Sequence, residues 1–226
     1  MKPTPKLSSE DRRAAIIQAV RQVFAAKGFD GTTTRELAKA AGVSEALLFK
    51  HFPNKEALYT AMQRACCQQE PEKRERLAAL EPTASTLVLL VHTLVSHIVG
   101  DEDDDAVQTR LMLRSLLEDG EFARLTLQRL AAGWLPKVEE CIRGAIAAGD
   151  AVAGPGVPAV QGWFTQHLAS SVMIHLLPGA RVVDHGVPRE QLIEQTVWFA
   201  LRGMGLKEAV IKRHYNPKAL ALMAAS

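Results

Sequence analysis

The chain has few aromatic residues and no long apolar run. Aromatic residues make up only 5% of the sequence, although hydrophobic residues make up 47%. No apolar segment approaches the ~18 to 20 residues that a membrane-spanning helix requires, so we expect no membrane span. The first ten residues are polar and include two prolines, which is atypical of a signal or transit peptide. We therefore expect a cytoplasmic protein.

Cysteine is also scarce. The three cysteines are Cys66, Cys67 and Cys141, and no CxxC spacing occurs. This pattern indicates neither a disulfide framework nor a zinc site, and it suits a reducing compartment. A thiol sensor at the adjacent pair is an alternative to buried, idle cysteine. The acidic residues 101–105 lack the EF-hand pattern, so we interpret them as a solvated loop and predict no metal site.

Sequence motifs of catalysis are missing as well. The chain contains no GxSxG elbow, no P-loop and no HExxH motif. No glutamate is followed by histidine three residues later, which argues against a ferritin-like metal centre. Residues 154–159 (GPGVPA) match GxGxxA formally, but they contain two prolines and follow a predicted helix instead of a strand. We expect no cofactor and no enzymatic activity; an enzyme remains an alternative.

Charge is distributed unevenly along the chain. Residues 1–55 contain ten lysines and arginines and five acidic residues, which leaves 17 basic and 20 acidic residues in the remainder. A basic N-terminal segment on a mildly acidic remainder is typical of a phosphate-binding module attached to a regulatory domain. A difference of this size also arises by chance, so the asymmetry alone is weak evidence.

Strand-like alternation is nearly absent, and apolar residues recur at helical spacing through most of the chain. This predicts an all-α fold, with an N-terminal three-helix domain over 1–55 and a larger helical domain over 56–226. A short helix followed by a frayed tail is expected after residue 206. The predicted helices cover residues 9–26, 33–41, 45–52, 55–69, 72–80, 83–99, 106–118, 121–148, 159–177 and 189–206.

Residues 33–52 (TTRELAKAAGVSEALLFKHF) have the layout of a helix-turn-helix motif. Thr33 and Glu36 form a capping-box pattern at the start of the first helix. Gly42 permits the sharp turn, and Ser44 is the natural N-cap of the second helix. Short side chains at the start of that second helix allow its backbone to approach base edges in a major groove. The motif therefore predicts binding to double-stranded DNA.

The longer run GFDGTTTRELAKAAGVSEALLFKHFPNKEAL resembles the DNA-binding domain of the TetR family of transcriptional regulators. The similarity covers residues ~9 to 60 and includes the preceding helix and the start of the fourth. It implies operator binding by a homodimer and a helical domain that responds to a small molecule. The resemblance implies DNA contacts at Thr33, Thr34, Ser44, Glu45, Ala46, Leu47, Phe49, Lys50, His51 and Lys55.

These positions have different implied roles. Thr33, Thr34 and the cations would contact phosphates, whereas Glu45 would accept from cytosine and Leu47 would touch a thymine methyl. Phe49 departs from the family pattern, which usually has tyrosine there. The alternative for each residue is a structural role, such as helix capping by Thr33.

In the family, the last two long helices form the dimer, which here implies residues 159–177 and 189–206. Candidate residues for a small-molecule pocket are large apolar or aromatic side chains and one histidine. These are Met112, Phe122, Trp134, Trp163 and His167. The alternative is that all five are ordinary core or interface residues. Three further histidines, at 92, 97 and 175, are equally ambiguous.

The resemblance also suggests a mechanism in which the effector shifts a population between two arrangements of the dimer. The fourth helix would transmit the change, because it starts near the DNA and enters the larger domain. The remaining alternative is a helical ligand-binding or scaffold protein without DNA binding.

Overall fold

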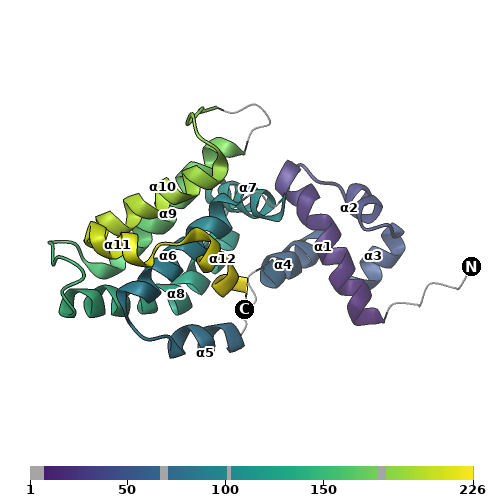
Figure 1. The fold of residues 1–226 in the computed structure, drawn as a ribbon. Coiled ribbons are helices and arrows are strands. Elements are labelled where there is room, and N and C mark those ends of the chain that lie inside the picture. Colours follow the sequence, from purple (N-terminus) through teal and green to yellow (C-terminus); the bar gives the residue numbers. More distant parts are fainter. Residues whose placement is uncertain (1–7, 67–70, 101–102, 178–181, 226) are drawn as a thin grey trace, which may run out of the picture. The chain divides into compact units, whose positions relative to one another are not determined.

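The computed structural model describes residues 8–66, 71–100, 103–177 and 182–225. Within these ranges the regular structure is helical, with one isolated bridge between Ala151 and Leu206, which confirms the predicted all-α class. None of the helices in this part of the chain is long and apolar enough to cross a membrane. The helices (Figure 1) are α1 (Ser9–Lys27), α2 (Thr34–Ala40), α3 (Glu45–His51), α4 (Lys55–Cys66), α5 (Pro71–Ala79), α6 (Ala84–Val99), α7 (Asp103–Leu117), α8 (Glu121–Ala147), α9 (Pro158–Leu176), α10 (Arg189–Gly203), α11 (Glu208–His214) and α12 (Pro217–Ala225).

The chain divides into two compact units. The head unit comprises Met1–Gln68 and Arg110–Leu127, and the body unit comprises Gln69–Thr109 and Gln128–Ser226. The compact head unit continues past residue 55, and the domain boundary expected there stays a prediction. This unit includes α4, which packs on α1, and it takes in a distant segment formed by the end of α7 and the start of α8.

Local signals explain where several helices begin. Ser8, Thr33, Ser44 and Thr83 each have extended backbone and accept a hydrogen bond from an N–H in the first turn of the following helix. Such N-caps satisfy donors that have no partner within the helix. The same residues are recognisable in the sequence, which is why the predicted helix starts are close to the observed ones.

The head unit has a small apolar core. Phe24 of α1 and Phe52 after α3 are almost completely buried, as are Leu37 of α2 and Leu58 of α4. The ring of Phe24 packs edge-on against Tyr59, with centroids 4.9 Å apart. This core fixes α2 and α3 against α1 and α4, and so determines which face of α3 stays exposed.

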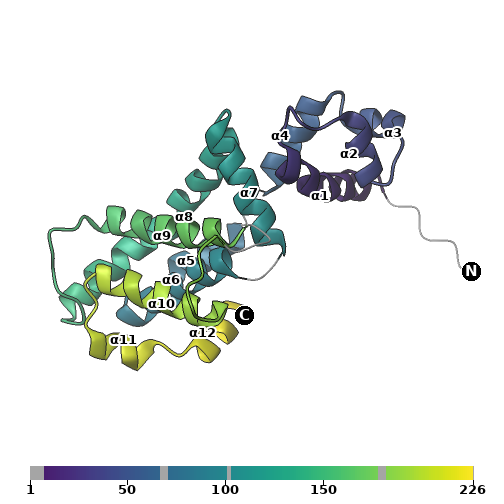
Figure 2. The same ribbon diagram turned by 90° about the horizontal axis from the view of Figure 1, so that it is seen from above.

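The body unit is built around α6. Its apolar residues form one core with residues of α8, α9, α10 and the C-terminal helices. Helices α9 and α10, which the family resemblance assigns to dimerisation, lie side by side (Figure 2). Arg189 at the start of α10 donates to the carbonyls of Val99 and Gly100 at the end of α6, which holds the two helices together.

Two predictions about the body were wrong. Residues 103–105 were expected in an acidic loop, but α7 begins at Asp103. Carboxylates in a first turn are favoured by the positive end of the helix dipole, so acidity there supports a helix start. The tail was expected to fray after one short helix, yet α12 follows α11 and packs on α6 with Leu220 buried.

Candidate DNA-binding site

The turn between α2 and α3 has helix-turn-helix geometry. Gly42 adopts φ +64°, a left-handed conformation that disfavours other residues. Its N–H donates to the Lys39 carbonyl at 3.1 Å, and the Val43 N–H donates to the Ala38 carbonyl at 3.0 Å. These bonds close the end of α2, and Ser44 then caps α3 by accepting from the Leu47 N–H at 3.2 Å. The predicted motif is therefore present with its predicted cap.

The start of α2 is held by the capping box that the sequence predicted. The Thr33 hydroxyl accepts from the Glu36 N–H at 3.3 Å, and the Glu36 carboxylate accepts from the Thr33 N–H at 3.0 Å. Glu36 also pairs with the Lys27 ammonium at the end of α1. The hydrogen bond from Lys27, followed by those from Thr33, lowers the pKa of Glu36 to about 2. The carboxylate thus ties α1 to α2.

Helix α3 presents two different faces. Leu48 is 2% exposed and Phe52, directly after the helix, is 1% exposed, so these residues face the core. Ser44, Glu45, Ala46 and Lys50 are exposed, and Phe49 is 42% exposed, whereas Leu47 and His51 are half-buried. Of the residues assigned to base contact, Ser44, Glu45 and Ala46 are therefore accessible, whereas Leu47 is only partly so.

A hydrogen bond joins the first turns of the two motif helices. The Thr34 hydroxyl donates to the Glu45 carboxylate at 2.9 Å. This contact fixes the carboxylate at the N-terminus of α3. Sequence reasoning assigned both residues to DNA contact but did not pair them, because their separation of eleven residues follows from the turn geometry.

Lys55 is oriented into the protein. Its ammonium donates to the carbonyls of Phe29 and Thr32 at 2.9 and 3.0 Å, and it lies 4.2 Å from the centroid of the Phe29 ring. These contacts secure the connector between α1 and α2. Lys55 lies at the start of α4, as the sequence predicted. Its observed contacts favour a structural role, and its contact with a DNA phosphate stays a prediction.

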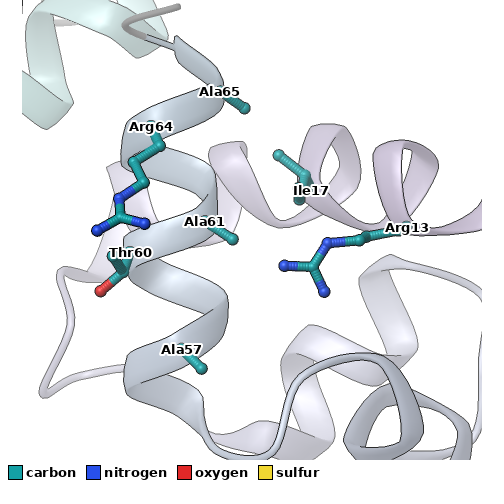
Figure 3. A pocket seen from close by; sticks show the side chains of 7 residues that line it. All are labelled: Arg13, Ile17, Ala57, Thr60, Ala61, Arg64 and Ala65. Atoms are coloured by element: carbon teal, nitrogen blue, oxygen red, sulfur yellow. The ribbon is translucent and has the colours of Figure 1, made fainter. Parts of the chain in front are cut away.

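Arg13 is a cation that sequence reasoning missed. Its guanidinium donates to the His51 carbonyl at the end of α3 at 2.6 Å and stacks 4.2 Å from the centroid of the Phe52 ring. It also borders a groove of about 450 Å³ between α1 and α4. Figure 3 shows Arg13 and Ile17 reaching toward α4, with three alanines of α4 on the facing side. The 38-residue separation from His51 leaves no local signal for this contact.

The five candidate pocket residues are divided between the units. Met112 and Phe122 belong to the head unit, and Phe122 is completely buried there. Trp134, Trp163 and His167 belong to the body unit. The Trp134 indole donates to the Leu90 carbonyl at 3.2 Å, and the rings of Trp163 and His167 stack 6.1 Å apart. The structure therefore does not unite the five within one unit, and a pocket at the three body residues stays a prediction.

Few of the remaining metal and thiol candidates have side chains among the described residues. Among the described residues, no three histidine, cysteine, aspartate or glutamate side chains gather as metal ligands would. Asp101, Cys67 and the side chain of Cys66 lie outside the described residues. Cys141 is buried, and burial raises the pKa of its thiol to about 11. A thiol in that environment is unreactive at neutral pH.

Comparison with known proteins supports the resemblance of the N-terminal segment. The sequence model for bacterial regulatory proteins of the TetR family matches residues 16–62, from the middle of α1 to the end of α4. The HTH-type transcriptional repressor Rv1474c of Mycobacterium tuberculosis is 32% identical over 131 residues, which are 56% of this chain and 64% of that protein. The N-terminal segment of the chain is therefore similar to the DNA-binding segment of TetR-family regulators. The relatives are named as transcription regulators, which favours a regulator over an enzyme.

Solved TetR-family structures share the fold of nearly the whole chain. A bacterial regulatory protein of the TetR family from Rhodococcus RHA1 superposes with a TM-score of 0.62 at 24% identity, covering 87% of this chain and 98% of that one. AibR, solved with isovaleryl coenzyme A and operator DNA, gives 0.58 at 20% identity over 83% and 97%. These similarities extend the family fold to the body, where the match to Rv1474c covers less than two thirds of that relative.

Proposed function

We propose that this chain is a TetR-family repressor that binds operator DNA as a homodimer and is released by a small-molecule effector. The observation that carries the proposal is the exposed face of α3, preceded by a turn and caps of helix-turn-helix geometry. Folding does not require a phenylalanine to be exposed on α3 next to Glu45, Ala46 and Lys50. A helix that enters a major groove does require an accessible, partly polar face.

Each exposed position then has a role. Glu45, held by Thr34, accepts a hydrogen bond from a base amino group, and Leu47 contacts a thymine methyl. Lys50 and His51, toward the end of α3, lie near the sugar-phosphate backbone of the DNA. Thr33 and Thr34 bind phosphate at the start of α2. Phe49 contacts sugar or methyl groups, and Ser44 and Ala46 allow close approach.

The homodimer is supported by the surface of α9 and α10. Large apolar side chains on these helices are exposed: Phe164 by 63%, Phe199 by 70% and Val160 by 42%. On α9, the exposed residues at 160, 164, 167, 171 and 174 follow a helical stripe, in which Val160, Phe164 and Ile174 are apolar and His167 and Ser171 are polar. Exposed apolar stripes of this kind mark interaction surfaces. A symmetric dimer through this face would bury them and present two copies of α3.

Effector release is supported by kinship with ligand-binding regulators. AibR was solved with an acyl coenzyme A and with operator DNA, and Rv1474c is named as a repressor. Isovaleryl coenzyme A is therefore a rational first compound in a screen. The effector binds more tightly to the dimer arrangement that cannot bind DNA. It can therefore lower operator affinity by at most the ratio of its affinities for the two arrangements.

The test begins with selection of bound fragments from a random duplex library by the wild-type protein. Affinity for an enriched duplex should fall steeply with salt, because phosphate contacts release counterions. Glu45→Ala should change the preferred sequence, whereas Lys50→Ala should weaken binding to all duplexes about equally. Circular dichroism checks that both variants fold. A protein that enriches no duplex at low salt would support the scaffold alternative.

A further inference from the structure

The groove between α1 and α4 is lined mainly by small apolar side chains. Ala57, Ala61 and Ala65 recur at four-residue spacing along α4, and Ile17 of α1 lies across from them (Figure 3). Its volume of about 450 Å³ is within the range of small-molecule sites. All the residues that line it belong to the head unit, so the groove is a feature of that unit alone.

The polar part of the lining is cationic. Arg13 extends its guanidinium from α1 toward the alanine methyl groups of α4, and Arg64 and Thr60 border the groove from α4 (Figure 3). Of the described residues that line the groove, none is an aspartate or a glutamate. A concave surface that gathers positive charge without a neutralising carboxylate attracts anions. The groove therefore complements a molecule that has both a negative charge and an apolar part.

Arg13 keeps hydrogen-bonding capacity for such an anion. A guanidinium has five N–H donors, and one of those of Arg13 goes to the His51 carbonyl at 2.6 Å. The Phe52 ring, 4.2 Å from the guanidinium carbon, supports the plane of the group. A planar guanidinium binds a carboxylate through two parallel hydrogen bonds. A carboxylate at Arg13 would leave its apolar tail against the alanine methyl groups.

We propose that the groove between α1 and α4 binds a small organic carboxylate with a short apolar tail, at a site separate from any effector site in the body unit. Arg13 pairs with the carboxylate, and the alanines of α4 cover the tail. Binding in the groove does not depend on the proposed function, whereas its effect on DNA rests on that function.

The contact of Arg13 with His51 links the groove to the recognition helix. His51 is the last residue of α3, and its carbonyl is held by the guanidinium that the carboxylate would also use. A bidentate pair between two ions is stronger than a single hydrogen bond to a neutral carbonyl, so the carboxylate draws the guanidinium away from His51. The end of α3 then loses this contact. A bound carboxylate therefore weakens DNA binding.

Titration calorimetry of the full chain with octanoate tests the site. Octan-1-ol has the same tail without the charge, and it should bind at least about tenfold more weakly, because a hydrogen bond to a charged group is lost. Ala61→Leu fills the groove and changes no charge, so it should weaken octanoate binding by about tenfold or more. The matched control is Ala15→Leu, because Ala15 is exposed on α1 and lies about 200° around the helix from both Arg13 and Ile17. This control should bind octanoate like the wild type.

A second pair of variants separates the site from general attraction by positive charge. Arg13→Gln should weaken octanoate binding by about tenfold or more. Arg35→Gln removes the charge of an exposed arginine of α2 that does not line the groove, and it should match the wild type. Circular dichroism checks the folding of every variant. Should either Ala61→Leu or Arg13→Gln be unfolded, the other decides.

The effect on DNA is measured with the duplex that the wild-type protein enriches, at constant ionic strength. Saturating octanoate should weaken duplex binding by about fivefold or more in the wild type and in Ala15→Leu, the usual lower limit of coupling between sites. The duplex affinity of Ala61→Leu should not respond to octanoate.

The site is overturned if the wild type does not bind octanoate, or if Ala61→Leu binds it as tightly as the wild type does. Equal losses in Arg13→Gln and Arg35→Gln would reveal general attraction by charge and would also overturn it. Octanoate that binds in the groove without changing duplex affinity overturns the link to α3. A wild-type protein that enriches no duplex removes the proposed function, while calorimetry without DNA still decides whether the groove binds the carboxylate.

Discussion

Replacing Lys55 by methionine tests whether this lysine serves the fold or the DNA. Methionine keeps an unbranched apolar side chain and removes the ammonium that binds the Phe29 and Thr32 carbonyls and lies over the Phe29 ring. A hydrogen bond to a charged group contributes about 1.5–3 kcal/mol. An exposed cation–π contact contributes about 0.5–1 kcal/mol. Lys55 is only half-buried, so the lower values apply to its two hydrogen bonds and its cation–π contact, and the head should lose about 3.5 kcal/mol.

The assay exploits the distribution of tryptophan. All three tryptophans, Trp134, Trp163 and Trp198, lie in the body unit, so their fluorescence reports on the body alone. Circular dichroism reports on the helices of both units. In urea, the helical signal of the head should unfold earlier in Lys55→Met by about 1–2 M, given a slope of about 2 kcal/mol per molar. The tryptophan transition should stay in place.

Lys50→Met is the matched control, because Lys50 is an exposed lysine on α3. It should change the head stability by less than about 0.5 kcal/mol and should weaken DNA binding. The reasoning is refuted if Lys55→Met unfolds like Lys50→Met and still loses affinity for DNA. Lys55 would then be the phosphate contact that the family resemblance implies.

Three further predictions concern the dimer face, pH and the buried thiol. Phe199→Glu should shift the protein from dimer to monomer in sedimentation. The stability measured by tryptophan fluorescence should not fall, since the Phe199 ring is 70% exposed in a single chain. A variant that stays dimeric would place the interface elsewhere. The pKa of Glu36 lies near 2 in the folded head, so its stabilising effect is complete above about 4.5 and is lost as the pH falls toward 2. Glu36→Gln should flatten acid unfolding of the head in that window, and an unchanged acid profile would contradict the ion pair. With the other two cysteines replaced by serine, Cys141 should react with a thiol reagent only after denaturation, whereas fast labelling of the native protein would contradict its burial.

Local chemistry explains what the sequence predicted well. The caps at Thr33 and Ser44 and the glycine turn at Gly42 act within a few residues, so they are recognisable without a structure and the structure contains them. The family resemblance covers the same segment, because a helix that must fit a groove tolerates few alternatives. Burial of Leu48 and Phe52 follows from helical periodicity in the same way.

Contacts between distant segments explain what the sequence missed. The Arg13 contact with His51 and the contact of Arg114 with α1 join residues 38 or more positions apart. The candidate pocket stays a prediction for the same reason, since aromatic residues are recognisable in a sequence but their neighbours are not.

The helices, their caps and the helix-turn-helix motif are recognisable in the sequence, because they depend on backbone hydrogen bonds and periodicity over one or two turns. That Lys55 faces the connector and that the end of α7 belongs to the head unit follow only from packing in the folded chain. Packing assigns each side chain to a neighbour, and that choice depends on the whole folded chain.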